Sequence, residues 1–313
     1  MPYVDDLVSQ FWSYRQHVFA GQDHLFDRPA PTASRPPVFL RDKAEHNVLV
    51  DPQLDPPARN QVVSAIPPWK RHRWFRSMRS SQALVQSVFG TLKTLGMLHI
   101  LADVVSDEGN CPFDFGGGEP KAKLEKEVTT LGELAGRTTE VDLFLSLDRR
   151  VAVECKLAEE NVGRCSRANP KTAIRFHCDG SYTHQQGRVA RCSLTEAGIL
   201  YWQFIPQLFR WNGNGDMAEC PLRGTYQLVR NVLAGCAHDG TLDADKGVAV
   251  LLYDERNPAF TQGKGFISYQ MVRCALANRR NLCRVTWQRV LSTMRNHRDL
   301  NWLTTQVQLK YGL

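Results

Sequence analysis

Apolar residues recur at roughly helical spacing in several stretches of the chain. The longest stretch covers residues 79–105, where Ser80 or Ser81 can cap the first helical turn. Gly90 and Gly96 can interrupt it, so the pattern predicts either one helix or two. The same spacing predicts further helices at residues 6–19, 195–211, 225–237 and 299–309.

Three candidate strands follow a glycine-rich turn region at residues 109–120. They cover residues 122–130, 139–147 and 151–157. A short polar turn at residues 148–150 favours a hairpin between the last two. The apolar sequence GVAVLLYD, at residues 247–254, is typical of a strand buried on both faces, and residues 285–294 hold another strand or the start of a helix. This order of elements predicts an α/β fold, in which a mixed central sheet has helices on both faces.

Proline is concentrated at the start of the chain, where residues 1–68 hold ten of the sixteen prolines. Because proline blocks long helices and central strands, we expect a Pro-rich N-terminal arm at residues 1–68, irregular apart from its early helix. This arm is expected to wrap on a main domain at residues 69–313, and an independent N-terminal domain fits the pattern less well. Within the main domain, residues 158–222 form a predicted Cys/His-rich insertion.

The composition is that of a globular protein. The 313 residues are 42% hydrophobic and 23% charged, which is sufficient for a sizeable core. A transmembrane helix is excluded, because no apolar stretch approaches about eighteen residues. The first residues lack the basic and apolar regions of a secretory signal, so we expect a cytoplasmic protein with no membrane partner. Its nine cysteines are then reduced thiols or metal ligands, and the formal charge of +7 favours a polyanionic partner.

Two carboxylates and a lysine fall on the predicted hairpin. Asp142 lies in its first strand, and Glu154 and Lys156 lie in its second. Side chains alternate across a strand, so Glu154 and Lys156 share one face while Cys155 points the other way. Pairing across the turn brings Asp142 close to Glu154 on that face. The three charged groups are therefore predicted to converge on the surface of the sheet.

This convergence has a chemical use. Two carboxylates supply the oxygen ligands that Mg²⁺ prefers, and the bound metal can activate a water. Lysine can stabilise the charge that develops on a phosphoryl group in the transition state. An ordinary cross-strand ion pair on a sheet surface is the alternative. The apolar neighbours in VDLFLSL and VAVECKL argue against it, because buried charges are costly unless they pair or act.

The D-x11-E-x-K pattern across two consecutive strands resembles the PD-(D/E)XK nuclease superfamily, which has the restriction-endonuclease-like fold. The wider sequence resembles a bacterial group of restriction endonucleases within that superfamily. The matching segments span roughly residues 70–255 and are RSSQALVQSVFG, GRTTEVDLFL, VAVECKLAEE, RCSLTEAGILYW and CPLRGTYQLVRN. The resemblance implies a mixed central sheet flanked by helices, with Asp142 and Glu154 as metal ligands and Lys156 as the catalytic lysine.

The resemblance also implies a glutamate on the preceding helix or first strand. We assign this role to Glu127, with Glu125 as the alternative, on the view that strand alternation decides which of them faces inward. The helix carries Gln82 and Gln86 and no glutamate. The number of metal ions in the site, one or two, is therefore left open. Gln227 and Arg230 are three residues apart and share a helix face. They resemble polar residues that related nucleases place beside the site, although a partly exposed amphipathic helix explains them equally well.

Four cysteines in the insertion can form a structural zinc site. The polar segment has few core-forming residues and would gain order from a metal ion. The expected ligands are Cys165, Cys178, Cys192 and Cys220, with His184 as a substitute for the fourth. Their spacing lacks the tight pairs of a zinc ribbon, so four unrelated thiols are the alternative.

The segment WKRHRWFRSMR, at residues 69–79, combines cations with aromatic rings. This mixture suits phosphate contacts with stacking on bases, although arginine can also pack on tryptophan at any surface. The predicted nucleic-acid contacts are Lys70, Arg71, Arg73, Arg76 and Arg79, together with Arg230.

These residues favour a DNA endonuclease that uses Mg²⁺ or Mn²⁺ and a metal-activated water to hydrolyse phosphodiester bonds. The family resemblance implies a role in restriction or phage defence, with a methylase or defence-system partner. A homodimer is expected if both DNA strands are cut. Two alternatives remain open: a non-catalytic nucleic-acid-binding subunit with the same fold, and an exonuclease or RNase that uses the same site.

Overall fold

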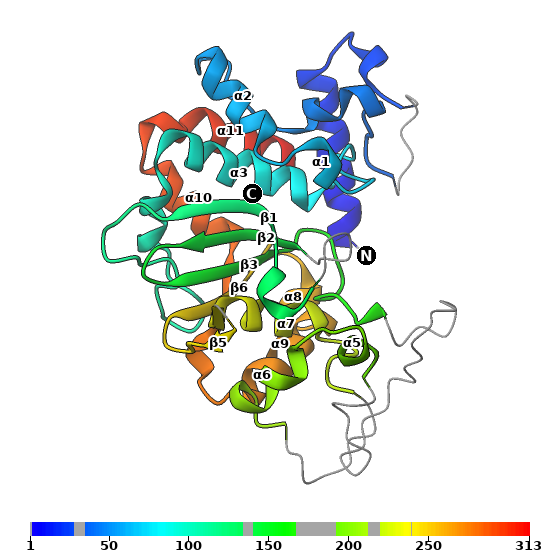
Figure 1. Ribbon diagram of the computed structural model, residues 1–313. Coiled ribbons are helices and arrows are strands. Elements are labelled where there is room, and N and C mark those ends of the chain that lie inside the picture. The colour runs from blue at the N-terminus through cyan, green and yellow to red at the C-terminus, as the bar shows by residue number, and fades with distance from the viewer. Residues whose placement is uncertain (1, 28–34, 134–139, 167–191, 212–219, 239) are drawn as a thin grey trace.

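The computed structural model describes residues 2–27, 35–133, 140–166, 192–211, 220–238 and 240–313 (Figure 1). Its centre is a five-stranded mixed sheet with the strand order β1-β2-β3-β6-β7. The strands are β1 (Lys121–Glu127), β2 (Glu140–Ser146), β3 (Arg150–Cys155), β6 (Gly247–Tyr253) and β7 (Leu282–Thr286). β1, β2 and β3 pair antiparallel, whereas β3, β6 and β7 pair parallel. The predicted mixed sheet and the β2–β3 hairpin are therefore confirmed.

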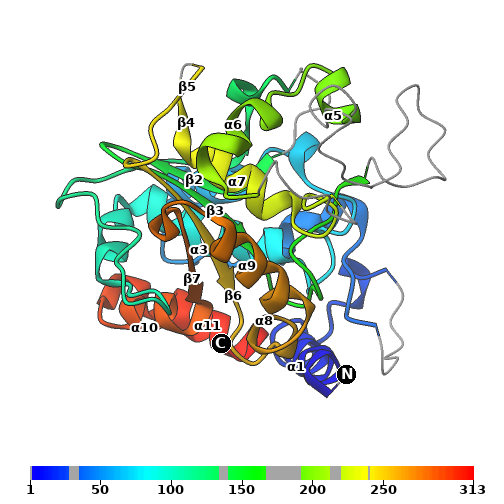
Figure 2. The ribbon, with the colours of Figure 1, turned by 90° about the horizontal axis from the view of Figure 1, so that it is seen from below.

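Helices cover both faces of the sheet, as the sequence pattern predicts. One face packs against α3 (Ser81–Leu95), α10 (Trp287–Arg295), α11 (Asn301–Tyr311) and α1 (Pro2–Val18). The other face packs against α6 (Tyr201–Leu208), α7 (Tyr226–Cys236) and α9 (Lys264–Ala275), which are seen from below in Figure 2. Every residue of β6 is buried between these layers, with Val250 in one core and Leu251 in the other. A strand covered on both sides needs apolar residues at every position, which explains the sequence GVAVLLY.

The ends of α3 follow the capping signals in its sequence. The Ser80 hydroxyl accepts a hydrogen bond from the Ala83 backbone N–H at 3.2 Å, as an N-cap does. Gly96 ends the helix in the left-handed conformation, at φ of 65°. Gly90 remains inside the helix, and a separate 3₁₀ helix, η4 (Leu98–Asp103), follows. The predicted stretch at residues 79–105 therefore holds two helical elements, divided at Gly96.

The N-terminal segment holds a second helix, α2 (Pro56–Ser64), where the proline pattern predicted only one early helix. The two prolines that open α2 occupy its first turn, where a backbone N–H has no helical partner and its loss costs nothing. Asp55 caps this turn by accepting a hydrogen bond from the Ala58 N–H at 2.7 Å. Phe11, Phe39 and other described residues of the segment lie in the core cluster that also contains α3 and β3. The division of the chain at residue 68 stays a prediction.

Besides several short 3₁₀ helices, the described chain holds four more short elements. They are α5 (Ser193–Glu196), β4 (Ala237–His238), β5 (Thr241–Leu242) and α8 (Pro258–Thr261). α8 and α9 were not predicted, because α9 buries only Gly265, Tyr269 and Val272 and so lacks a strong apolar stripe. Much of the predicted insertion, including residues 167–191 and 212–219, lies outside the described residues. None of the described helices is both long and apolar enough to cross a membrane.

Candidate active site

Three acidic residues from neighbouring strands lie side by side across the sheet, and we call Glu125, Asp142 and Glu154 the acidic row. Glu125 of β1 lies between the pairs Leu124–Leu143 and Lys126–Val141, so it stands opposite Asp142 of β2. Leu143 in turn pairs with Val153 of β3, which brings Glu154 beside Asp142. The Cys155 backbone N–H donates to Asp142 Oδ2 at 2.7 Å and fixes that carboxylate against β3. The register of the sheet thus gathers acids that are far apart in the sequence.

The Glu154 carboxylate is the centre of a buried polar network. Its Oε1 accepts a hydrogen bond from Lys156 Nζ at 2.7 Å. Its Oε2 accepts from Asn231 Nδ2 at 2.9 Å and lies 3.3 Å from an Arg230 guanidinium nitrogen. Lys156 Nζ also donates to Gln227 Oε1 at 3.0 Å. Glu154, Lys156 and Arg230 are all buried, so this network holds charges that would be costly without partners.

The helix α7 supplies the polar groups that face Glu154 and Lys156. Gln227, Arg230 and Asn231 are spaced at i, i+3 and i+4, which places them on one helix face. The structure therefore brings the predicted Gln227 to Lys156 and the predicted Arg230 to Glu154. Asn231 was not predicted to act here, although the same helical spacing identifies it as a neighbour of both. Gly163 packs tightly on the Gln227 side chain, at a position where a Cβ atom would overlap it.

Burial and mutual repulsion raise the pKa values of two of the acids. The pKa of Asp142 is raised to about 7, first by burial and then by the charge of Glu154, against the opposing effect of Lys156. Burial and the charge of Asp142 raise the pKa of Glu125 to about 9. For Lys156, burial lowers the pKa, but the charge of Glu154 outweighs this effect and the net pKa is raised. Lys156 is therefore a cation at neutral pH, while Asp142 is poised to gain or lose a proton.

The two glutamates of β1 have different surroundings. Glu125 is the one beside Asp142, and Glu127 instead forms an ion pair with Lys70 at 3.0 Å. By position, Glu125, the alternative to Glu127, is the glutamate of the first strand that lies beside Asp142, and the role of either residue stays a prediction. Strand alternation cannot separate residues 125 and 127, because side chains two apart share a face. The difference arises from the backbone of Glu125, which has a positive φ of 48° and interrupts the regular strand.

Gln82 connects α3 to the segment that precedes it. Its side chain accepts from the His72 N–H at 3.1 Å and donates to the Lys70 carbonyl at 3.1 Å. A further hydrogen bond from Gln82 to Glu125 lowers the pKa of that carboxyl, against the larger effect of burial. Gln82 thus touches the acidic row from the opposite side to α7.

The predicted nucleic-acid contacts divide into paired and exposed groups. Lys70 lies 2.8 Å from Glu140 as well as 3.0 Å from Glu127, and Arg76 lies 2.9 Å from Asp27. Arg71 donates to the Ile66 and Val63 carbonyls, and Arg230 belongs to the Glu154 network.

Arg73 and Arg79 are exposed. Trp69 and Trp74 are 82% and 51% exposed, and the Arg73 guanidinium lies 4.6 Å from the centre of the Trp74 ring. Exposed cations and rings therefore remain together in this segment.

The predicted zinc ligands are described only in part. Cys192 and Cys220 are buried in the core cluster around α6 and α7, and Cys165 packs against the same cluster. The Cys165 backbone N–H donates to the Arg223 carbonyl at 3.2 Å, which joins the two ends of the insertion. Cys178 and His184 lie outside the described residues. Within the described part of the chain, no group of three or more His, Cys, Asp or Glu side chains is arranged to hold a metal ion.

The carbonyl groups after β3 are held by distant elements. Trp287 Nε1 donates to the Lys156 carbonyl at 3.2 Å. The Leu157 carbonyl accepts from the Tyr3 hydroxyl and from Asn257 Nδ2, both at 2.8 Å. These bonds come from α10, α1 and the loop after β6. They fix the backbone that carries Lys156.

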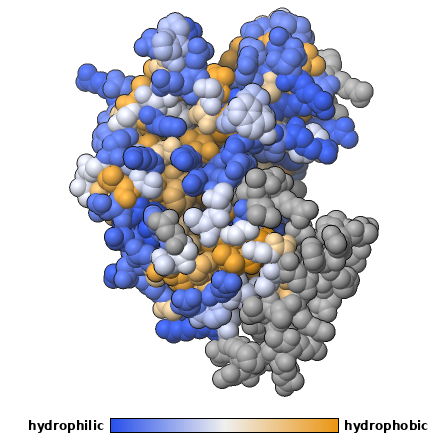
Figure 3. All heavy atoms as spheres, in the orientation of Figure 1, coloured by the Kyte–Doolittle hydropathy of each residue, from blue (hydrophilic) through white to orange (hydrophobic). Residues whose placement is uncertain are grey.

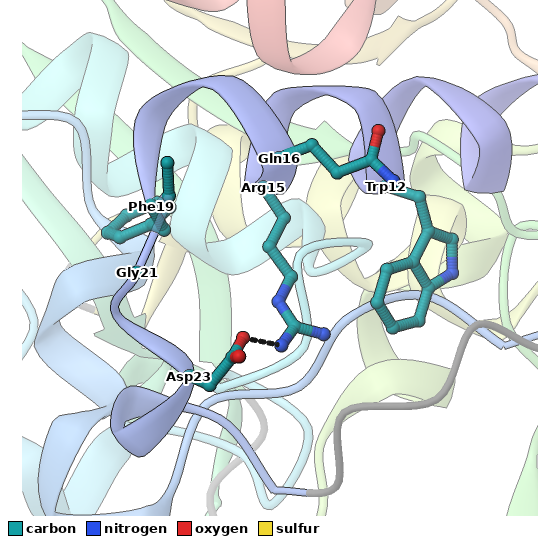
Figure 4. A pocket seen from close by; sticks show the side chains of 7 residues that line it. Trp12, Arg15, Gln16, Phe19, Gly21 and Asp23 are labelled. Carbon is teal, nitrogen blue, oxygen red and sulfur yellow. Dashed lines mark hydrogen bonds and ion pairs between the residues drawn. The ribbon is translucent and has the colours of Figure 1, made fainter.

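A separate pocket of about 270 Å³ lies beside α1 and is lined by Trp12, Arg15 and Asp23 among others (Figure 4). Arg15 lies 2.7 Å from Asp23, and its guanidinium is 4.2 Å from the centre of the Phe26 ring. The lining contains none of the predicted site residues. Its cation is already paired and packed, so this pocket is not the candidate active site.

A model of one protein family matches residues 33–312 of the chain, which include every residue of the acidic row and of the α7 network. The family is described as "Restriction Endonuclease associating with ARP" (REase-ARP). The chain belongs to this family. Membership in the REase-ARP family indicates a nuclease of the restriction-endonuclease kind, and the family description points to a protein partner. Neither the curated proteins nor the solved structures contain a match to the chain.

Proposed function

We propose that the chain is a Mg²⁺-dependent DNA endonuclease of the PD-(D/E)XK type, with its active site at Asp142, Glu154 and Lys156. The convergence of these three groups across the β2–β3 hairpin carries the proposal. Burial of the Glu154 and Lys156 charges is costly for folding, and a cluster of perturbed carboxylates beside a lysine is typical of a functional site. Family membership supports the nuclease activity.

The acidic row has the chemistry that a hard divalent cation requires. Asp142 is crowded by the charge of Glu154, and the repulsion between these two carboxylates favours a bound positive charge. Carboxylate oxygens are the preferred ligands of Mg²⁺ and also suit Mn²⁺. Asp142 and Glu154 would hold the ion as a pair of carboxylate ligands. When bound, the ion would supply Lewis acidity that lowers the pKa of a water and offsets charge on the phosphoryl oxygens.

The other residues of the site hold charges in place. Lys156 is a buried cation that can stabilise the phosphoryl group as negative charge develops on it. Gln227 accepts one hydrogen bond of the Lys156 ammonium group and orients it. Arg230 and Asn231 fix Oε2 of Glu154, so that both carboxylate oxygens have defined positions. In this proposal Arg230 is a positioning residue.

Further parts of the proposal concern substrate and partners. Arg73 and Arg79 contact DNA phosphates, and the exposed rings of Trp69 and Trp74 stack on bases. Lys70, Arg71 and Arg76 shape this segment through their protein contacts. A structural Zn²⁺ on Cys165, Cys178, Cys192 and Cys220, a homodimer, a methylase partner and a role in restriction or phage defence remain part of the proposal.

The test is cleavage of plasmid and single-stranded DNA with Mg²⁺, compared with EDTA. Lys156→Met removes the ammonium group, and Lys264→Met removes an exposed lysine of α9 as its control. We expect Lys156→Met to lower the cleavage rate at least about a hundredfold, while the control retains the wild-type rate. The ends of the products distinguish endonuclease from exonuclease.

DNA affinity in EDTA and the melting temperature are measured for each variant, so that loss of folding is not mistaken for loss of catalysis. Equal cleavage by Lys156→Met and Lys264→Met would contradict the proposed site. DNA binding by an inactive wild type would favour a non-catalytic binding subunit, and cleavage of RNA alone would favour an RNase.

A further inference from the structure

A second concave surface lies next to the acidic row. It is a pocket of about 460 Å³ between β1, β2 and the end of α7, and we call it the β1–β2 pocket. Its lining includes Lys121 and Lys126 of β1, Phe144 of β2, Arg150 of β3 and Ala234 of α7. None of these residues belongs to the network around Glu154. On the face shown in Figure 3, which includes the front strands of the sheet, apolar area lies between hydrophilic residues.

The β1–β2 pocket continues the surface that carries the candidate active site. Phe144 follows Asp142 by two residues on β2, and so shares its face of the sheet. Ala234 follows Arg230 by one helical turn on α7, and so shares its face of the helix. A strand of nucleic acid bound at Asp142 therefore reaches the pocket by following β2 and α7.

The charges around the pocket suit a phosphate group. Among the described ion pairs, none involves Lys121 or Lys126. Arg150 donates a hydrogen bond from its Nε to the Gly235 carbonyl at 2.8 Å, and its guanidinium lies 3.8 Å from the Asp243 carboxylate. Burial and the nearby charges of Lys123 and Lys70 lower the pKa of Lys126, which shows that positive charges crowd this edge. Glu127, the acidic residue among the described lining residues, is already paired with Lys70.

The floor of the pocket suits an aromatic base. Phe144 is partly exposed, and Lys126 Nζ lies 5.7 Å from the centre of its ring. Lys126 lies over the face of this ring, and its flexible side chain can give that face to a stacked base and place its ammonium group on the adjoining phosphate. The volume is that of a small-ligand site, which admits one nucleotide and excludes a duplex.

We propose that the β1–β2 pocket binds one nucleoside phosphate unit, with its base on Phe144 and its phosphate on Lys121 and Lys126. The unit belongs to a single strand that continues to the acidic row, and in this respect the inference rests on the proposed nuclease function. A free mononucleotide presents the same chemistry and is distinguished by experiment.

The first experiment measures the affinity for a fluorescein-labelled oligonucleotide of ten thymidines, by anisotropy in EDTA at several salt concentrations. The double variant Lys121→Met/Lys126→Met removes both cations. Its control, Lys93→Met/Lys264→Met, removes two exposed lysines elsewhere. For single strands, each phosphate contact contributes about 0.7 to the slope of log affinity against log salt. Because the two lysines share one phosphate, we expect the pocket variant to reduce this slope by about 0.7 and the control to leave it unchanged. Equal slopes for the two double variants would overturn the proposal.

The second experiment tests the stacking surface. Phe144→Leu keeps an apolar side chain without a ring, and Phe144→Tyr retains the ring. We expect Phe144→Leu to weaken oligonucleotide binding by about tenfold and Phe144→Tyr to restore it. Equal affinities for the two variants would overturn the stacking role. Calorimetry with thymidine monophosphate then shows whether a free nucleotide binds through the same residues. Binding of neither probe would overturn the proposal.

Failure of this inference is distinguishable from failure of the proposed function, because all binding is measured without metal. Dependence of binding on Lys121, Lys126 and Phe144 in a protein that never cleaves would support the pocket and contradict the nuclease. Cleavage by the protein, together with an oligonucleotide affinity that does not change in these variants, would support the nuclease function and overturn the proposed role of the pocket.

Discussion

Asp142→Asn should stabilise the metal-free protein at alkaline pH while abolishing cleavage. Asparagine has nearly the same shape, and its Oδ1 can still accept the hydrogen bond from the Cys155 N–H. What it removes is a negative charge between Glu154 and Glu125. Residues kept for binding or catalysis often reduce stability in this way, because the ligand that balances their charge is not part of the fold.

The magnitude follows from the pKa of Asp142, which is raised from 3.8 to about 7. The folded state then holds this proton more tightly than the unfolded chain, so ionisation between about pH 4 and pH 7 lowers the free energy of unfolding. At 1.36 kcal/mol per pKa unit the full effect is about 4 kcal/mol. Because Asp142 is only partly buried and retains some water, we expect roughly 1–3 kcal/mol at pH 8.5.

The assay is urea unfolding in EDTA at pH 5 and pH 8.5, for wild type, Asp142→Asn and the control Asp148→Asn. Asp148 lies in the exposed turn after β2, so Asp148→Asn removes the same charge outside the site. The gain from Asp142→Asn should be larger at pH 8.5 than at pH 5, and Asp148→Asn should show no such difference. Added Mg²⁺ should stabilise wild type more than Asp142→Asn. The reasoning is refuted if Asp142→Asn gives no more stability at pH 8.5 than at pH 5.

Two further predictions concern Gly163 and Lys310. Gly163→Ala places a Cβ atom against Gln227, so cleavage should fall at least about tenfold with DNA affinity in EDTA unchanged. The control is Gly109→Ala, because Gly109 also has a positive φ but has open space where the new Cβ would lie. Equal cleavage by the two variants would contradict the role of Gln227. Burial lowers the pKa of Lys310 to about 7, so the folded state binds this proton less tightly and its contribution to stability rises between about pH 7 and pH 10. Across that range, wild type should gain on the order of 3 kcal/mol relative to Lys310→Met, and parallel curves of unfolding free energy against pH would disprove this.

Much of the site could be predicted because it depends on local periodicity. Alternation along β3 places Glu154 and Lys156 on one face, and the short turn at residues 148–150 brings Asp142 beside them. Helical spacing places Gln227 and Arg230 on a common face of α7. These relations hold for any regular strand or helix, whatever surrounds it.

The assignment of the first-strand glutamate could not be predicted in the same way. Glu125 and Glu127 are two residues apart, so a regular strand would place both side chains on the same face. The positive φ at Glu125 interrupts the strand and gives the two side chains different surroundings. The sequence predicted that Lys70 and Arg76 contact phosphate. In the structure Lys70 forms an ion pair with Glu127, and Arg76 forms one with Asp27. A charge pattern shows which residues can bind an anion, but not which of them the fold has already paired.

The sequence by itself determined the class of the fold, the β2–β3 hairpin and the three groups at its face, since these follow from short-range patterns of apolar and polar residues. Only the tertiary structure decided that α7 covers β3, that Asn231 bonds Glu154, that Glu125 lies beside Asp142, and that the β1–β2 pocket opens next to them. It also decided that Trp287 and Tyr3 hold the carbonyl groups after β3. These last two contacts join residues more than a hundred positions apart. All of these contacts depend on how buried surfaces fit together, which no local pattern encodes.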